Sequence, residues 1–119
     1  MPEKRVVIVS GASRGIGAAT ARWLAKAGAA VTLFARSADG QEAVARDVRK
    51  RGGAVLVCKG DVSDAGTCRT AVAKTLERFG RLDAVVNNAA DQSVAMLAEM
   101  TDADWQAMMN ANVNAVFSL

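Results

Sequence analysis

Three glycines near the start of this sequence have the spacing of an anion-binding loop. Gly11, Gly15 and Gly17 lie in the stretch SGASRGIGAAT, after an unbroken apolar run and before a helical pattern. Glycines there let the backbone approach a ligand, and the amides at the helix start favour an anion such as a pyrophosphate. No Gly-Lys-Ser/Thr follows, so the lysine of a triphosphate loop is absent. The alternative is a tight turn that only lets the helix pack, but the position after a first strand favours dinucleotide binding.

Two arginines bear on which dinucleotide such a loop would take. A site for NAD usually has an acidic residue at the end of the second strand, where it bonds the ribose 2′-hydroxyl. Here the stretch LFARS places neutral Ala35 and then Arg36, and Arg14 precedes Gly15 in the first loop. Two guanidiniums can hold a 2′-phosphate by charge-assisted hydrogen bonds, although a single arginine is most often a solvated surface charge. The hypothesis is NADP (NADPH) in preference to NAD, with NAD still possible.

Asn112 is an amide within an apolar stripe of helical spacing. A buried amide without partners costs about 1–3 kcal/mol, so backbone, water or another side chain must satisfy it. Spacing alone favours a structural asparagine that bonds a neighbouring strand. The other members of the stripe are Trp105, Met108, Met109, Val113, Val116 and Phe117.

The elements that must position these residues alternate along the chain. Apolar runs predict strands at 5–10, 30–34, 54–58 and 82–87, and helical patterns predict helices at 16–27, 39–51, 64–79 and from Thr101 onward. Gly28 and Gly80 are expected to end the first and third helices, Ser63 or Asp64 to cap the third, and Thr101 with Asp104 to form a capping box. This alternation predicts a parallel sheet with right-handed crossovers and helices on both faces. We therefore expect one α/β domain over residues 1–119, a Rossmann-type doubly wound sheet of four strands in the order 3-2-1-4. The first helix is expected to bury Ile16, Ala19, Thr20, Trp23, Leu24 and Ala27, and the third to bury Cys68, Ala71, Val72, Thr75, Leu76 and Phe79.

The composition excludes several classes of function. No apolar run approaches the ~20 residues of a membrane span, and the run before Gly11 is too short for a signal peptide, so we expect a cytoplasmic protein. The chain has two cysteines and no histidine, which makes a metal site improbable and excludes a Ser-His-Asp triad within it. With few aromatic residues and no tyrosine, a nucleic-acid stacking surface is not expected, and the net charge of +3 suits an anionic small ligand.

Four motifs together resemble the short-chain dehydrogenase/reductase family. They are VSGASRGIG at 9–17, GDV at 60–62, RLDAVVNNAA at 81–90 and the tryptophan-to-NANVNAVF segment at 105–117. They stand in that family's order, near its usual separations, and cover essentially the whole chain. Ser10 stands where the family usually has threonine, which keeps the hydroxyl, and Ala90 stands where glycine is commonest.

The resemblance implies roles for individual residues. Asp61 would accept a hydrogen bond from the adenine amino group, although an aspartate that only opens a helix is the alternative. Asn87 would brace the sheet and the adenosine ribose, and Asn112 would be catalytic, binding a water that links a catalytic lysine to solvent. The implied cofactor-binding residues are Gly11, Ser13, Arg14, Gly15, Ile16, Gly17, Arg36, Ser37, Asp61, Val62, Asn87, Ala89 and Ala90.

The rest of the family's catalytic set has no match in this sequence. The family also uses a serine and a Tyr-x-x-x-Lys pair, but the chain contains no tyrosine, and neither Ser93 nor Ser118 is assigned a role. We therefore expect the cofactor-binding half of an NAD(P)-dependent oxidoreductase, incomplete at its C-terminal end and inactive by itself. In full-length form it would transfer hydride between small carbonyls and alcohols. The alternatives are a non-catalytic NADP(H)-binding module and an inactive fragment. A bare edge at the fourth strand leads us to expect self-association, as a homo-oligomer.

Overall fold

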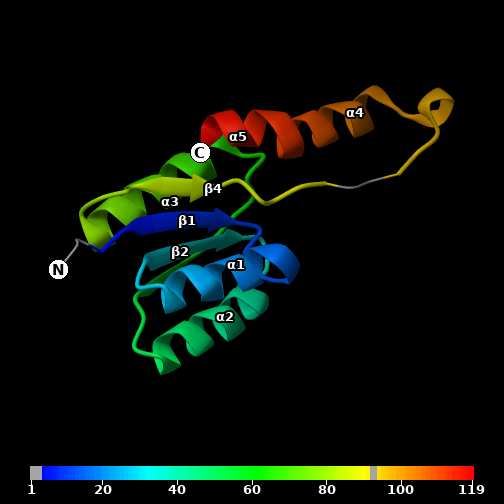
Figure 1. Cartoon of the computed structure of the whole chain (residues 1–119). Coiled ribbons are helices and arrows are strands. Elements are labelled where there is room, and N and C mark those ends of the chain that lie inside the picture. Colours follow the sequence, from blue (N-terminus) through cyan, green and yellow to red (C-terminus); the bar gives the residue numbers. More distant parts are fainter. Residues whose placement is uncertain (1–3, 92–93) are drawn as a thin grey trace.

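The computed structural model describes residues 4–91 and 94–119, and its centre is a parallel sheet of four strands (Figure 1). The strands are β1 (Val6–Ser10), β2 (Ala30–Ala35), β3 (Val55–Lys59) and β4 (Ala84–Val86), in the order β3-β2-β1-β4. Ile8 of β1 lies opposite Thr32 of β2 on one side and Val85 of β4 on the other. The predicted order 3-2-1-4 is confirmed, although β4 is shorter than the predicted 82–87.

Helices cover both faces of the sheet, as the alternating pattern predicted. Helices α1 (Gly15–Lys26) and α2 (Ala38–Lys50) lie on one face, and α3 (Ala65–Phe79) lies on the other (Figure 1). Successive residues of β1 point to opposite faces. Val7 and Val9 therefore join the core beneath α1 and α2, and Ile8 joins the core beneath α3. Strands β1 and β2 are buried along their whole lengths because both of their faces are covered.

The buried face of α1 differs from the prediction. Ala18 and Ala21 are buried, whereas Ile16 is 78% and Trp23 is 68% exposed. Of the large apolar residues predicted on this face, Leu24 packs against the core and is partly buried, whereas the predicted Ala19 and Ala27 are exposed. A Cβ on Gly17 would overlap the carbonyl oxygen of Gly11, so the helix start sits too close to β1 for large side chains to intervene. In α3 the predicted Cys68, Ala71 and Thr75 are buried, but Leu76 is half exposed.

The C-terminal segment consists of η1 (Leu97–Glu99), α4 (Asp102–Met109), the π-helical turn η2 (Asn110–Asn114) and α5 (Ala115–Ser118). It projects from the sheet at its α4 end, whereas α5 lies beside α3, where Ala115 is buried (Figure 1). The predicted capping box at Thr101 is confirmed, because its hydroxyl accepts from the Asp104 amide and the Asp104 carboxylate accepts from the Thr101 amide. The predicted stripe is not buried here: Trp105, Val113, Val116 and Phe117 are all more than half exposed.

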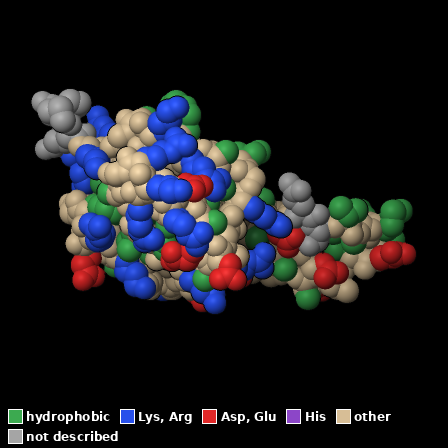
Figure 2. All heavy atoms as spheres, turned by 90° about the horizontal axis from the view of Figure 1, so that it is seen from below, with side chains coloured by type: hydrophobic (Ala, Val, Ile, Leu, Met, Phe, Trp, Pro, Cys, Tyr) green, Lys and Arg blue, Asp and Glu red, His purple; other side chains and the backbone are tan. Residues whose placement is uncertain are grey.

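The surface differs between these two parts of the molecule. In Figure 2, Lys and Arg side chains are spread over the body of the domain, whereas hydrophobic side chains stand out along the projecting segment. No helix among residues 4–91 and 94–119 has the length and apolar character of a membrane span. Ser93, which received no role, lies outside the described residues.

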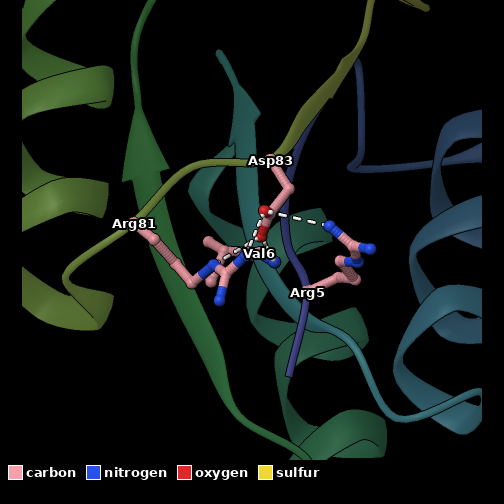
Figure 3. A network of polar contacts seen from close by, with 4 residues as sticks. All are labelled: Arg5, Val6, Arg81 and Asp83. Carbon is pink, nitrogen blue, oxygen red and sulfur yellow. Dashed lines mark hydrogen bonds and ion pairs between the residues drawn. The ribbon is translucent and has the colours of Figure 1, made fainter. Parts of the chain in front are cut away.

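Asp83 ties the start of β4 to the start of β1 (Figure 3). Its carboxylate accepts from the Val6 amide at 2.8 Å and from two nitrogens of Arg81 at 2.6 and 2.9 Å, and Arg5 lies 3.5 Å away. These donors stabilise the ionised form, Arg81 most strongly, and lower the pKa of Asp83 from 3.8 to about 2.

This lowered pKa predicts an acid-dependent part of the stability. A carboxylate with a lower pKa in the folded state contributes stability above its unfolded pKa and loses it as pH falls through the folded value. The contribution of Asp83 should therefore be complete above about pH 4 and disappear between pH 4 and 2. In urea unfolding across this range, Asp83→Asn should flatten the acid dependence. Asp47→Asn, which removes the exposed ion pair with Arg22, should retain the wild-type profile. An Asp83→Asn profile as steep as the wild type's would contradict the assignment.

Candidate functional site

The residues singled out from the sequence gather at one edge of the sheet. In a parallel sheet the carboxyl ends of all strands meet at the same edge, and ligands of open α/β folds bind there. Three hydrogen bonds join the residues that follow one strand to the end of the neighbouring strand. The Gly11 amide donates to the Phe34 carbonyl at 2.8 Å, the Gly60 amide donates to the Ala35 carbonyl at 2.9 Å, and the Ala89 amide donates to the Ser10 hydroxyl at 3.1 Å.

The glycine loop between β1 and α1 has the backbone that an anion site requires. Gly11 and Gly15 have φ angles of +67° and +57°, a region that favours glycine. Arg14 precedes the first helical residue and gives no side-chain cap, and the first turn of α1 contains no acidic residue. A Cβ on Gly15 would meet nothing within 4 Å, so the loop opens to free space. Within the described part of the chain, the first amides of α1 therefore have no side-chain cap and are suited to bind an anion.

Ser10 and Asn88 hold this loop against the end of β4. The buried Ser10 hydroxyl accepts from the Asn88 and Ala89 amides, both at 3.1 Å, and lies 3.4 Å from the Val86 carbonyl. The Asn88 side-chain amide donates to the Gly11 carbonyl at 3.3 Å. Asn87, which is predicted to brace the sheet and the adenosine ribose, is exposed at the end of β4, and its role stays a prediction. The motif NNA contains both residues, and only their orientation distinguishes them.

Arg36 and Asp61 follow β2 and β3 at neighbouring positions of the same edge. Arg36 and Arg14 are both exposed. Asp61 Oδ1 accepts from the Ser63 amide at 2.9 Å and from the Ser63 hydroxyl at 2.7 Å. These two bonds are the main cause of the lowered pKa of Asp61, and the positive charge of Arg36 lowers it further. Asp61 is thus held as an anion beside Arg36, while Asp64 and not Ser63 caps α3.

The remaining predicted residues line this edge to different degrees. Ser37 caps α2 through a bond from the Gly40 amide at 3.3 Å, and Val62 is buried and accepts from the Cys68 thiol at 3.2 Å. Ala89 is half-buried and Ala90 is exposed. The exposed side chain of Ile16 lies in the first turn of α1.

Asn112 is satisfied at both ends by one backbone unit. Its Oδ1 accepts from the Asp91 amide at 2.7 Å, and its Nδ2 donates to the Asp91 carbonyl at 2.9 Å. This pair joins the π-helical turn η2 to the loop after β4. The amide thus has the backbone partners that it needs, but they lie in a loop and not in the neighbouring strand that spacing alone suggested. The catalytic role of Asn112 stays a prediction, and its place in η2 fits that role because π-helical turns are frequent at functional sites.

Comparison with known proteins identifies the family. The family model described as short chain dehydrogenase matches residues 5–119. An uncharacterised oxidoreductase of Methylorubrum extorquens is 40% identical, over 96% of this chain and 46% of its own length. A double mutant of the Serratia marcescens short-chain dehydrogenase/reductase has a TM-score of 0.93 at 42% identity, covering 99% of this chain and 49% of that one.

A third relative has a cofactor analogue bound. The Thermococcus sibiricus alcohol dehydrogenase complexed with 5-hydroxy-NADP has a TM-score of 0.91 at 38% identity, covering 98% of this chain and 50% of that one. The present chain thus spans about half the length of the proteins it matches. Because the family model matches nearly every residue and four parallel strands carry the site, the chain belongs to the short-chain dehydrogenase family.

Proposed function

We propose that this chain binds NADP(H) and is the dinucleotide-binding part of an oxidoreductase that interconverts carbonyls and alcohols. The observation that carries the proposal is a glycine loop with uncapped helix amides, flanked by two exposed arginines at the carboxyl edge of the sheet. The relative from Thermococcus sibiricus, complexed with 5-hydroxy-NADP, supports a nicotinamide dinucleotide of this kind. The cofactor supplies hydride transfer, and the residues of this chain bind and orient it.

The pyrophosphate is assigned to the glycine loop. The Gly11 end of the loop packs against the segment after β4, since a Cβ on Gly11 would lie 2.8 Å from the Asn88 side-chain nitrogen and 2.9 Å from Ala89 Cα. That packing leaves the amides from Gly15 to Gly17 as the donors at the open side. Ser13 precedes these donors and Ile16 lies among them, and Ala89 and Ala90 follow β4 with small side chains that suit the ribose next to the nicotinamide.

The adenosine half is assigned to Asp61, Val62 and Asn87. Within the described residues only Oδ1 of Asp61 receives hydrogen bonds, so Oδ2 is available to accept from the adenine amino group. Arg14 and Arg36, with Ser37, would hold the 2′-phosphate. Ala35 is buried and neutral, so this end of β2 offers no carboxylate to the ribose 2′-hydroxyl of NAD.

Asn112 is assigned a positioning part in the reaction. Its two bonds to Asp91 fix η2 against the loop after β4, which would hold the helix backbone beside the nicotinamide end of the site. We propose further that the whole protein turns over a small carbonyl or alcohol substrate and that it self-associates. The exposed Val113, Val116 and Phe117 would provide the surface for that association.

Direct titration tests the proposal. NADPH and NADH are each titrated calorimetrically into the protein, with Trp23 and Trp105 fluorescence as a second signal. We expect NADPH to bind at least about tenfold more tightly, which corresponds to about 1.4 kcal/mol, and to lose affinity as salt increases. Equal affinities would contradict the proposed preference for NADP, and failure to bind either dinucleotide would contradict the proposed function. A turnover assay with a panel of carbonyls then separates an enzyme from a module that only binds.

A further inference from the structure

We propose that Gly40, in the first turn of α2, is a positioning residue that sets the spacing between Arg14 and Arg36 and thereby the preference for NADPH over NADH. The inference rests on the proposed function, because it concerns the same dinucleotide site. Among the described residues, Gly40 forms no hydrogen bond with the amides of the glycine loop or with either arginine. Its effect on the two arginines would therefore be indirect.

The first turn of α2 packs directly on the glycine loop. A Cβ on Gly40 would lie 2.8 Å from the Ser13 carbonyl oxygen and 2.9 Å from the Ser13 Cβ. These atoms are backbone and the root of a side chain, so they cannot rotate away as the end of a long side chain can. Ser13 is followed by Arg14, and any displacement at this contact therefore reaches the guanidinium that we assign to the 2′-phosphate.

The other side of the same turn is fixed to the end of β2. Gln41 is fully buried, and its Nε2 donates to the Ala35 carbonyl at 2.6 Å. The Gly40 amide donates to the Ser37 hydroxyl at 3.3 Å. Arg36 lies between Ala35 and Ser37, the two residues that these bonds hold. The first turn of α2 thus lies between the segment that carries Arg36 and the segment that carries Arg14. These segments can approach closely because Gly40 has no side chain.

The spacing matters more for NADPH than for NADH. Charge-assisted hydrogen bonds are short, and a site loses its contacts once the groups move by about 0.5 Å. A methyl group at position 40 requires a shift of that order, because backbone contacts near 2.8 Å must relax to ordinary van der Waals distance. The two dinucleotides differ only in the 2′-phosphate, so separation of the two arginines should weaken NADPH selectively.

Gly40→Ala tests the inference, with NADPH and NADH as the probes. We expect the ratio of NADPH affinity to NADH affinity to fall roughly fivefold, with NADH affinity almost unchanged. Gly66→Ala is the matched control, because Gly66 lies in the first turn of α3 and a Cβ there would meet only the Asp64 carboxylate at 3.2 Å and Arg69 at 3.8 Å. The control should keep the wild-type ratio.

A second variant covers the case in which Gly40→Ala does not fold. Gln41→Leu keeps the size of the side chain, removes the bond to Ala35, and also removes Oε1, which is buried without a partner in the described part of the chain. It should lower the same ratio by releasing the turn from β2. An unchanged ratio in either variant, once circular dichroism shows it folded, overturns the inference. Failure of the wild-type protein to bind either dinucleotide overturns the proposed function instead, and the inference with it.

Discussion

Replacement of Gly17 by alanine is expected to abolish dinucleotide binding and to lower the free energy of unfolding by about 2–3 kcal/mol. The added Cβ would overlap the Gly11 carbonyl oxygen and lie 2.6 Å from the Asn88 side-chain amide. Neither neighbour can yield easily, since the Gly11 amide is bonded to Phe34 and Asn88 is bonded to both Ser10 and Gly11. The start of α1 would have to move away from β1, and the amides assigned to the pyrophosphate would move with it.

Gly15→Ala separates this steric effect from backbone strain. Gly15 has φ +57°, but a Cβ added there would have nothing within 4 Å, so alanine costs only the left-handed conformation, roughly 1–2 kcal/mol. Thermal unfolding and NADPH titration of both variants provide the measurement. Gly17→Ala should lose more stability than Gly15→Ala. If Gly17→Ala melts and binds like the wild type, the close contact between α1 and the glycine loop is not what holds the site.

Features set by local sequence could be predicted. The alternation of apolar runs and helical patterns gave four strands in the right order, because a parallel sheet with right-handed crossovers allows few alternatives. The capping box at Thr101 and the helix-ending glycines at 28 and 80 depend on residues within a few positions, and both glycines have positive φ as such ends require. The placement of the glycine loop at the carboxyl edge followed from the same topology.

Features set by distant contacts could not be predicted. The buried face of α1 is chosen by the approach of Gly17 to Gly11, which favours Ala18 and Ala21 over the larger Ile16 and Trp23. The apolar pattern alone could not reveal this, because it ranks residues by hydrophobicity and not by the room available. The contact of Gly40 with Ser13 joins segments 27 residues apart, and no periodicity indicates it.

Two asparagines show the same limit at the site. Asn87 and Asn88 are adjacent and identical in chemistry, and only the geometry at the end of β4 directs the second toward Gly11. Asn112 was recognised from the sequence as an amide that needed partners, yet both partners belong to Asp91 in a loop 21 residues away. The need for a hydrogen bond can thus be inferred from sequence, whereas the identity of its partner depends on the fold.

Arg36→Asp is expected to reverse the dinucleotide preference. Loss of charge-assisted bonds to the 2′-phosphate costs about 1.5–3 kcal/mol each, and the new carboxylate would repel the phosphate, so NADPH affinity should fall roughly 100-fold. The same carboxylate can accept a hydrogen bond from the 2′-hydroxyl of NADH, as acidic residues at this position of dinucleotide sites do. NADH affinity should therefore rise a few-fold. Calorimetric titration of both dinucleotides measures the two changes together.

Arg46→Asp is the matched control for the reversal. Arg46 is an exposed arginine of α2, so the substitution changes the net charge by the same amount away from the carboxyl edge. It should weaken the binding of both dinucleotides slightly and equally, and this small effect should disappear as salt screens the charge. A further consequence distinguishes Arg36, because its positive charge helps to lower the pKa of Asp61. In Arg36→Asp the pKa of Asp61 should rise, and NADH binding should then weaken in acid at a higher pH than in the wild type, as protonated Asp61 no longer accepts from the adenine amino group. If Arg46→Asp changes the ratio of NADPH affinity to NADH affinity as much as Arg36→Asp does, the preference comes from the net charge of the protein. The 2′-phosphate is then not bound by Arg14 and Arg36.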